Sequence, residues 1–265
     1  MRRDFVRDVV NRLLARGVLS KDYAILAVCA GEAERDVFSE LGFRNVTLSN
    51  LDERMTPDAF APYRWEYQDV QSLSYADGAF DIVFVADGLH HCDAPHRALL
   101  EMYRVGQRGI VVVESRDSLL MRLAAQLGLT PDYELEAVVG NDFRYGGVNN
   151  TAIPNYIYRW TEREFEKTIA SYAPEGRHTF AYFYRFNLPF SQAAMKKNRL
   201  KYIVLHLARP FLWAATKVAP RQCNSFAMVA LRPELPRGLW PWLKLEADGV
   251  TIDEEYLRSR FTAPR

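Results

Sequence analysis

Residues 69–115 constrain the fold most, because they read as a complete strand–helix–strand unit. The apolar, β-branched run Phe80–Ala86 predicts a strand, and a helix follows that ends near Val105. A second apolar strand is expected over 109–114. Two strands joined by a helix at this spacing form a βαβ unit, which is right-handed and belongs to a parallel sheet.

Strands and helices alternate in the same way before this unit. Residues 1–19 have apolar positions at helical spacing, and strands are expected over 23–30 and 46–49 with a helix over 32–41 between them. The order is typical of a doubly wound α/β sheet.

The alternation breaks after Glu114. One helix is expected over 118–127, and the region up to 160 is rich in Gly, Asn and Tyr without periodicity. Thr161 followed by Glu164 forms a capping box, which predicts a helix running to about Tyr172. Strands over 179–186 and 225–231 are expected to close the sheet.

Composition excludes several function classes. The chain has 34 basic and 33 acidic residues, so its net charge gives no case for nucleic-acid binding. The three cysteines lack metal or redox spacing and fit a reducing compartment. Neither a signal peptide nor a membrane span is predicted, so we expect a cytoplasmic protein.

One motif ties the central unit to a known family. Asp69-Val70, Leu73, Asp77-Gly78 and the run 80–83 resemble class I methyltransferases that use S-adenosylmethionine (SAM), nearest to small-molecule enzymes of quinone, polysaccharide and natural-product pathways. The resemblance implies a Rossmann-like, seven-stranded mixed sheet whose last strand is antiparallel. It also implies that the Asp69 carboxylate and the Val70 backbone contact the adenine, and it adds Ala86 to the cofactor contacts.

Two further family motifs are degenerate in this chain. In the glycine-rich turn after the first strand only Gly31 remains, following Ala30, while Cys29 stands in place of another glycine. Small residues still allow close backbone approach to the amino-acid part of SAM. At the end of the second strand Asn50 replaces the usual ribose-binding acid, and Asp52 is the second candidate. A helix N-cap at either position is the plain structural alternative.

A pair of histidines follows the strand that ends at Ala86. Ligands of open α/β sheets bind beyond the carboxyl ends of the strands, so His90 and His91 are expected near the transferred methyl group. His91 is the first candidate for a catalytic base and His90 the second. The alternative is that both only pack or hydrogen-bond the loop. No metal site is expected, because the sequence around them has no acidic cluster at ligand spacing.

Two inserted segments, 116–160 and 190–222, are expected to form a cap. The first carries polar and aromatic residues suited to an acceptor with a ring or several hydroxyls, although an ordinary surface loop explains them equally well. With Asn155 as an additional member, the candidates for substrate binding are Arg144, Tyr145, Asn149, Asn150, Tyr156, Tyr158 and Arg159.

The second cap segment joins a basic cluster to an apolar stretch. Lys196, Lys197, Arg199 and Lys201 precede the stretch 202–215, which is expected to break at Pro210. A pair of buried helices or a homodimer contact is one interpretation. Contact of residues 196–219 with a membrane surface is the other. The tail 232–265 is expected to be loop-rich, and no role is assigned to it.

Together these features predict one class I methyltransferase domain over residues 1–265, with SAM as its cofactor. The expected reaction is O-methylation of a sugar, a glycan precursor or another hydroxylated metabolite. A non-catalytic binding or scaffolding protein of the same fold stays open, as does N- or C-methylation of a lipid-linked or natural-product substrate. A dinucleotide-dependent oxidoreductase is disfavoured, because the Gly-x-Gly-x-x-Gly fingerprint is absent.

Overall fold

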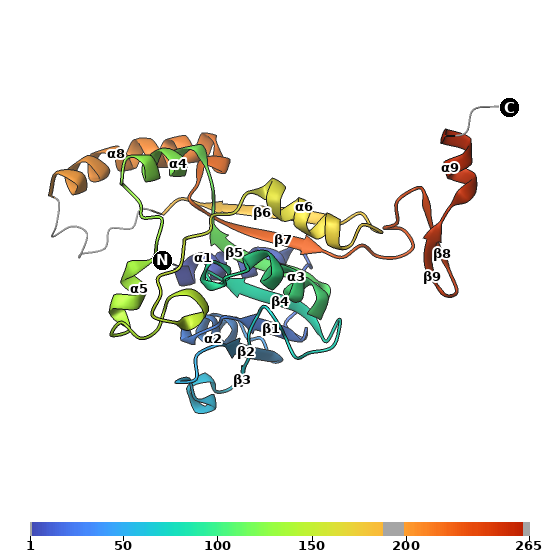
Figure 1. Cartoon of the computed structure of the whole chain (residues 1–265), viewed down its shortest axis with the longest axis horizontal. Coiled ribbons are helices and arrows are strands. Elements are labelled where there is room, and N and C mark those ends of the chain that lie inside the picture. The colour runs from blue at the N-terminus through green and yellow to red at the C-terminus, as the bar shows by residue number, and fades with distance from the viewer. Residues whose placement is uncertain (1, 188–198, 262–265) are drawn as a thin grey trace.

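The computed structural model describes residues 2–187 and 199–261, and its centre is a seven-stranded mixed sheet (Figure 1). The strand order is β3-β2-β1-β4-β5-β7-β6. Strands β1 to β5 are parallel, and β7 is antiparallel to both of its neighbours, β5 and β6. This topology confirms the predicted Rossmann-like sheet with an antiparallel last strand. The strands are β1 (Ile25–Val28), β2 (Val46–Asn50), β3 (Arg64–Tyr67), β4 (Phe80–Ala86), β5 (Gly106–Ser115), β6 (Thr179–Arg185) and β7 (Ser225–Leu231).

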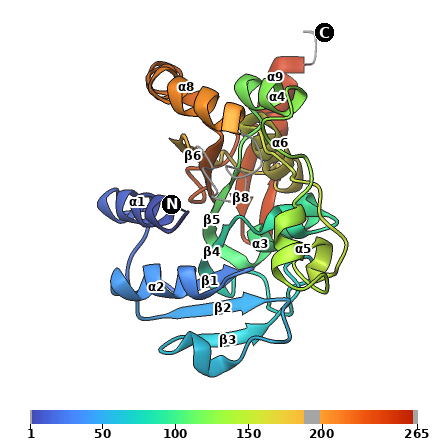
Figure 2. The same ribbon diagram turned by 90° about the vertical axis from the view of Figure 1, so that its left-hand side faces the viewer.

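Helices cover both faces of the sheet, as the two views show (Figures 1 and 2). Helices α1 (Arg2–Ala15) and α2 (Glu32–Glu40) lie on one face, and α3 (Pro95–Val105) and α6 (Glu162–Tyr172) on the other. A hydrophobic core lies on each face of the sheet, and β4 contributes to both because its side chains alternate. Ile82 and Phe84 lie in the core shared with α1 and α2, and Val83 and Val85 lie in the core shared with α3 and α6. A strand buried on both faces explains the continuous apolar run in the sequence.

Helix α6 begins at the predicted capping box. The Thr161 hydroxyl accepts a hydrogen bond from the Glu164 backbone N–H at 3.2 Å, and the Glu164 carboxylate accepts from the Thr161 backbone N–H at 3.4 Å. Two N–H groups without intrahelical partners are thereby satisfied. The helix then places Phe165 and Ile169 in the core against α3.

We expect Thr161→Ala to lower the free energy of unfolding by about 1 kcal/mol, because it removes the cap acceptor. Thr168→Ala is the matched control, since Thr168 lies inside the same helix and its hydroxyl donates to the Glu164 carbonyl. That change should be neutral or slightly stabilising, given the higher helix propensity of alanine. Urea denaturation measures both values, and equal losses would contradict the role of the cap.

The first cap segment contains more structure than predicted. Helix α4 (Leu119–Gln126) lies where one helix was expected, but a second short helix, α5 (Leu135–Gly140), follows it. The expectation of a single helix in this segment is therefore wrong. Helix α5 is only six residues long and contains two valines and a glycine, so its sequence carries little helical signal. Short 3-10 turns form at η1 (Pro57–Phe60), η2 (Leu89–His91) and η3 (Val148–Asn150).

The described part of the second cap segment contains the long helix α8 (Arg199–Val218), with Pro210 inside it. The predicted break at Pro210 is wrong: proline removes one intrahelical hydrogen bond, but its fixed φ is compatible with a helix. Several large apolar side chains of α8 are exposed, among them Leu207, Phe211 and Trp213. Lys196 and Lys197 of the predicted basic cluster lie outside the described residues.

The C-terminal tail holds more regular structure than expected. After η4 (Pro220–Gln222) and β7, strands β8 (Leu243–Glu246) and β9 (Gly249–Ile252) form a separate hairpin, and helix α9 (Glu254–Phe261) follows. Figure 1 shows the hairpin and α9 projecting beyond the end of the sheet. Across the described ranges, no helix combines the length and the apolar character needed to cross a membrane.

Candidate active site

The turn after β1 has the conformation that glycine normally supplies. Cys29 has φ +51°, in the left-handed region that costs a residue with a side chain about 1–3 kcal/mol. The turn also packs closely on the turn after β4, because a Cβ on Gly88 would lie 2.5 Å from the Cys29 Cβ. The backbone after β1 therefore makes a tight turn although Cys29 is not a glycine, and Gly88 makes room for the cysteine.

The ends of β1 and β2 are joined by hydrogen bonds next to this turn. The Ala30 N–H donates to the Ser49 carbonyl at 2.9 Å, and the Asn50 amide nitrogen donates to the Ala30 carbonyl at 3.0 Å. The Gly31 N–H donates to the Glu34 carboxylate at 2.9 Å. Asn50 thus uses its nitrogen within the protein, which leaves its amide oxygen as the acceptor at the end of β2.

Asp52, the second ribose candidate, is held by a neighbour. Its two carboxylate oxygens accept from the Arg54 guanidinium at 2.8 and 2.6 Å, and one also accepts from the Arg54 backbone N–H. The hydrogen bonds from Arg54 lower the pKa of Asp52 although burial opposes them. A carboxylate engaged on both oxygens is less available to a ligand than the free amide oxygen of Asn50.

Asp69 lies at the start of the loop between β3 and β4. One of its carboxylate oxygens accepts from the Gln71 backbone N–H at 2.9 Å, which fixes the turn. Val70 beside it is buried against the core, and Ala86 is buried at the end of β4. The turn thus holds the carboxylate at a defined place in the loop and keeps the other oxygen for a partner outside the turn.

His90 is anchored by a fully buried carboxylate. Its Nδ1 lies 2.7 Å from Glu114 Oε2, while Glu114 Oε1 accepts from the backbone N–H groups of Gly88 and Leu89 at 2.9 and 2.7 Å. Glu114, near the end of β5, therefore holds the whole turn that carries the histidines. Burial disfavours the imidazolium, but the carboxylates of Glu114 and Glu134 outweigh it and hold the pKa of His90 well above its usual value.

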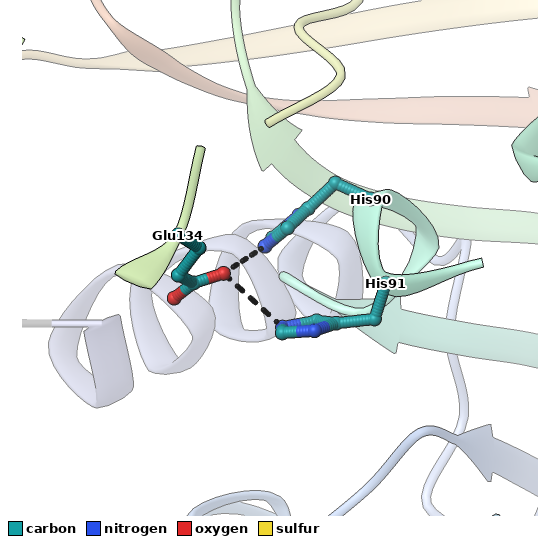
Figure 3. A group of neighbouring side chains, drawn as sticks. All are labelled: His90, His91 and Glu134. Atoms are coloured by element: carbon teal, nitrogen blue, oxygen red, sulfur yellow. Dashed lines mark ion pairs between the residues drawn. The ribbon is translucent and has the colours of Figure 1, made fainter. Parts of the chain in front are cut away.

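Glu134, just before α5, points at both histidines (Figure 3). Its Oε2 lies 3.3 Å from His90 Nε2 and 3.4 Å from His91 Nε2. The hydrogen bond from His90 is the main reason that the pKa of Glu134 falls to about 2. Burial and the neighbouring His90 lower the pKa of His91, whose side chain is 31% exposed against 7% for His90.

Asn155 completes this group from the cap. Its side-chain nitrogen donates to the His90 carbonyl at 3.1 Å and to Glu134 Oε2 at 3.4 Å. Its side-chain oxygen is buried and has no hydrogen-bond partner among the described residues. A buried amide oxygen without a donor is costly, so a donor or a cation supplied by a ligand would satisfy it.

The structure divides the predicted substrate residues into two groups, and the first lies beside the loops after β2 and β3. Asn149 accepts from the Gln71 side chain at 3.1 Å, and Asn150 donates to the Leu51 carbonyl at 3.2 Å. The Tyr145 ring lies under the Arg54 guanidinium at 4.1 Å. These residues tie the cap to the loops after β2 and β3. Arg144, beside them, is exposed.

The second group lines a cavity of about 490 Å³ beside α4 and the start of α6. Tyr158 contacts Glu164 and lies 3.2 Å from His96, and Arg159 pairs with Asp132 at 3.0 Å. Tyr156, also in the cavity wall, packs edge-on against Tyr133. The volume lies in the range of small-molecule sites, and the wall carries two tyrosines and several charged groups, but none of His90, His91 and Glu134 lines it.

Sequence reasoning missed Glu114 and Glu134. Glu114 lies near the carboxyl end of β5, directly after an apolar run, and an acid at that end of a buried strand is the signal that could have drawn attention to it. Glu134 had no such signal, because it lies in a segment without periodicity and 43 residues beyond His91. Only the path of the cap brings it to the histidines.

Comparisons with known proteins agree with the fold. The family described as a methyltransferase domain matches residues 26–113. The structure is similar to a chain in the complex of the Haloferax volcanii Trm112 methyltransferase activator with a candidate methyltransferase, at a TM-score of 0.53 and 12% identity over 85% of this chain and 88% of that one.

A second similar structure is magnesium protoporphyrin IX methyltransferase from Synechocystis PCC 6803 with bound S-adenosylhomocysteine (SAH), at a TM-score of 0.50 and 16% identity over 87% of this chain and 83% of that one. None of the curated proteins matches the sequence. Residues 26–113 thus match a methyltransferase domain family, and the chain has the fold of the methyltransferase structures to which it is similar.

Proposed function

We propose that this protein transfers the methyl group of SAM to a hydroxyl of a small molecule, with a sugar, a glycan precursor or another hydroxylated metabolite as the first choice. The observation that carries the proposal is the cluster His90–His91–Glu134 at the carboxyl end of β4, beside the predicted cofactor contacts. In sheets of this type ligands bind at that edge. The polar cavity beneath α4 supports a hydroxylated acceptor.

The residues at the ends of β1, β2 and β3 fit SAM. The turn at Cys29 and Gly31 offers a close backbone approach, and the free amide oxygen of Asn50 is the acceptor for a ribose hydroxyl. Asp69 is placed to accept from the adenine amine, with Val70 beside it. SAH bound in the Synechocystis protein of the same fold is consistent with this assignment.

Calorimetric titration with SAM and SAH tests the cofactor site. We expect Asp69→Ala to weaken SAH binding about 10–100-fold, because a hydrogen bond to a charged group contributes about 1.5–3 kcal/mol. Asp77→Ala is the matched control, since Asp77 lies in the same loop, its side chain is 82% exposed and it pairs with Arg104 of α3. Equal affinities of the two variants would contradict the role of Asp69.

Binding of neither ligand by the folded wild-type protein would contradict the proposed function. It would favour the non-catalytic binding or scaffolding protein that the degenerate glycine turn left open. Transfer of labelled methyl from SAM to a panel of monosaccharides, sugar nucleotides and catechols then tests the acceptor class. Labelling of amines or of carbon atoms instead of hydroxyls would replace O-methylation with the N- or C-methylation alternative.

His91 is the better placed of the two histidines to take a proton from the acceptor. His90 is enclosed by Glu114 and Glu134, whereas His91 is partly exposed and contacts Glu134 on one side only. Methyl transfer from a sulfonium needs little besides alignment of the nucleophile, so positioning contributes much of the rate, up to about 7–11 kcal/mol in favourable cases.

A lipid-linked acceptor is the second candidate, and the surface of the cap favours it. Leu207 and Phe211 on α8, Leu119 and Leu123 on α4, and Leu127 just after α4 follow helical spacing, and their side chains are 49–78% exposed. Figure 1 shows these two helices on the same side of the sheet. Sedimentation with anionic phospholipid vesicles tests it: binding lost in Phe211→Glu supports lipid contact. A shift from dimer to monomer in that variant would instead support a homodimer interface.

A further inference from the structure

His90, His91 and Glu134 meet at the turn after β4, and their side chains form the donor set of a metal site. His90 Nε2, His91 Nε2 and Glu134 Oε2 offer two imidazole nitrogens and one carboxylate oxygen within 4.8 Å of one another (Figure 3). Two histidines with one carboxylate form the ligand set of catalytic zinc sites and of non-haem iron sites, which keep open positions for a substrate or water.

Two of the three distances fit a cation shared by these atoms, and the two imidazole nitrogens lie within 4.8 Å of each other. Ligand atoms about 2.1 Å from a metal ion lie about 3.0–3.4 Å apart across an octahedral or tetrahedral edge. Glu134 Oε2 lies 3.3 Å from His90 Nε2 and 3.4 Å from His91 Nε2. Both imidazoles therefore meet the same carboxylate oxygen at the separation that a shared cation requires.

The surroundings of His90 also match those of a metal ligand. Its Nδ1 faces Glu114 Oε2 at 2.7 Å, which keeps a proton on Nδ1. In the metal-free protein Nε2 also carries a proton and donates it to Glu134, and a bound cation would replace that proton at Nε2. Glu114 is in turn fixed by two backbone N–H groups. A carboxylate behind a ligating histidine sets its tautomer and orientation, and such partners contribute about 10–100-fold to metal affinity.

Charge and an unsatisfied buried atom point to a cation as well. With His90 protonated, Glu114 and Glu134 still leave one uncompensated negative charge in a largely buried group, and a divalent cation that replaces the His90 Nε2 proton would balance both carboxylates. The Asn155 side-chain oxygen is buried without a partner and belongs to a residue that contacts both His90 and Glu134. It could accept from water or from an acceptor hydroxyl held by the cation.

We propose that His90, His91 and Glu134 bind a divalent transition-metal cation of the zinc or iron class, with Glu114 as the positioning residue behind His90. This inference deepens the proposed function, because a cation there would face the acceptor and polarise its hydroxyl. His91 would then act as a ligand, and the acceptor proton would leave to solvent.

Metal binding can be measured without SAM or acceptor, so its failure is distinct from failure of the proposed function. The protein is treated with a chelator and titrated with Zn²⁺ by calorimetry and with Co²⁺ by visible absorption. We expect one equivalent to bind, with at least 10-fold weaker binding in His91→Ala and Glu134→Gln. The control is Glu136→Gln, an exposed carboxylate two residues further on, which should bind as wild type does.

Glu114→Gln tests the positioning role. The amide keeps an oxygen for the two backbone N–H groups but presents N–H to His90 Nδ1, which moves the imidazole proton to Nε2 and blocks the ligand atom. Weaker Co²⁺ binding in a folded Glu114→Gln protein supports the arrangement. Absence of metal binding in wild type, or binding that is unchanged in His91→Ala and Glu134→Gln, overturns the proposal even if SAH binds normally.

Discussion

Glu114→Ala is expected to lower the free energy of unfolding by about 3–5 kcal/mol, the cost of removing one partner of a buried ion pair. The Glu114 side chain is fully buried and serves His90 together with the backbone N–H groups of Gly88 and Leu89. Alanine leaves all three without an acceptor in a site that water does not reach. Urea denaturation monitored by far-UV circular dichroism measures the loss.

Two further variants separate this effect from a general cost of altering a glutamate. Glu114→Gln keeps an acceptor for the backbone and should lose clearly less stability than the alanine variant. Glu32→Ala, at a side chain that is 71% exposed, should stay within about 0.5 kcal/mol of wild type. If Glu114→Ala lowers the free energy of unfolding no more than Glu32→Ala does, Glu114 does not hold the turn after β4.

Most of the sheet could be predicted because its strands carry strong local signals. Phe80–Ala86 and Ser225–Leu231 are apolar runs buried on both faces of the sheet, and their predicted bounds agree with the structure. The start of α6 was predicted from Thr161 and Glu164, whose reciprocal hydrogen bonds are local. Helix α5 and the tail hairpin were missed because their short segments gain order from tertiary contacts and turns, which leave little periodicity.

The candidate site was predictable only where it lies on the regular part of the fold. His90 and His91 follow a strand whose carboxyl end had to face the ligand, so their neighbourhood could be inferred. Glu134 and Asn155 reach the histidines from the cap, and their contacts depend on how the whole segment 116–160 folds back over the sheet. Sequence spacing cannot supply such a contact, which explains why the metal-like geometry was not foreseen.

His91→Ala is expected to reduce turnover about 10²–10⁴-fold, the usual contribution of a positioned acid or base. Affinity for SAH should change less than two-fold, because His91 is not among the predicted cofactor contacts, which lie at the ends of β1 and β2, in the loop after β3 and at Ala86. The measurement is methyl transfer to the acceptor found with the panel, and calorimetry gives the SAH affinity. His206→Ala, on α8 and outside the cluster, is the control and should retain activity.

The response of this variant to added reagents separates the two roles of His91. A base removed by mutation leaves a space that imidazole in solution can enter, so imidazole should restore part of the turnover without any metal. A lost ligand weakens the cation instead, so excess Zn²⁺ or Co²⁺ should restore turnover, and a chelator should inactivate the wild-type protein. The second result is expected, because the Nε2 atoms of His90 and His91 meet the same oxygen of Glu134. Turnover equal to wild type in His91→Ala would remove His91 from the reaction in either role and leave alignment of the acceptor as the source of the rate.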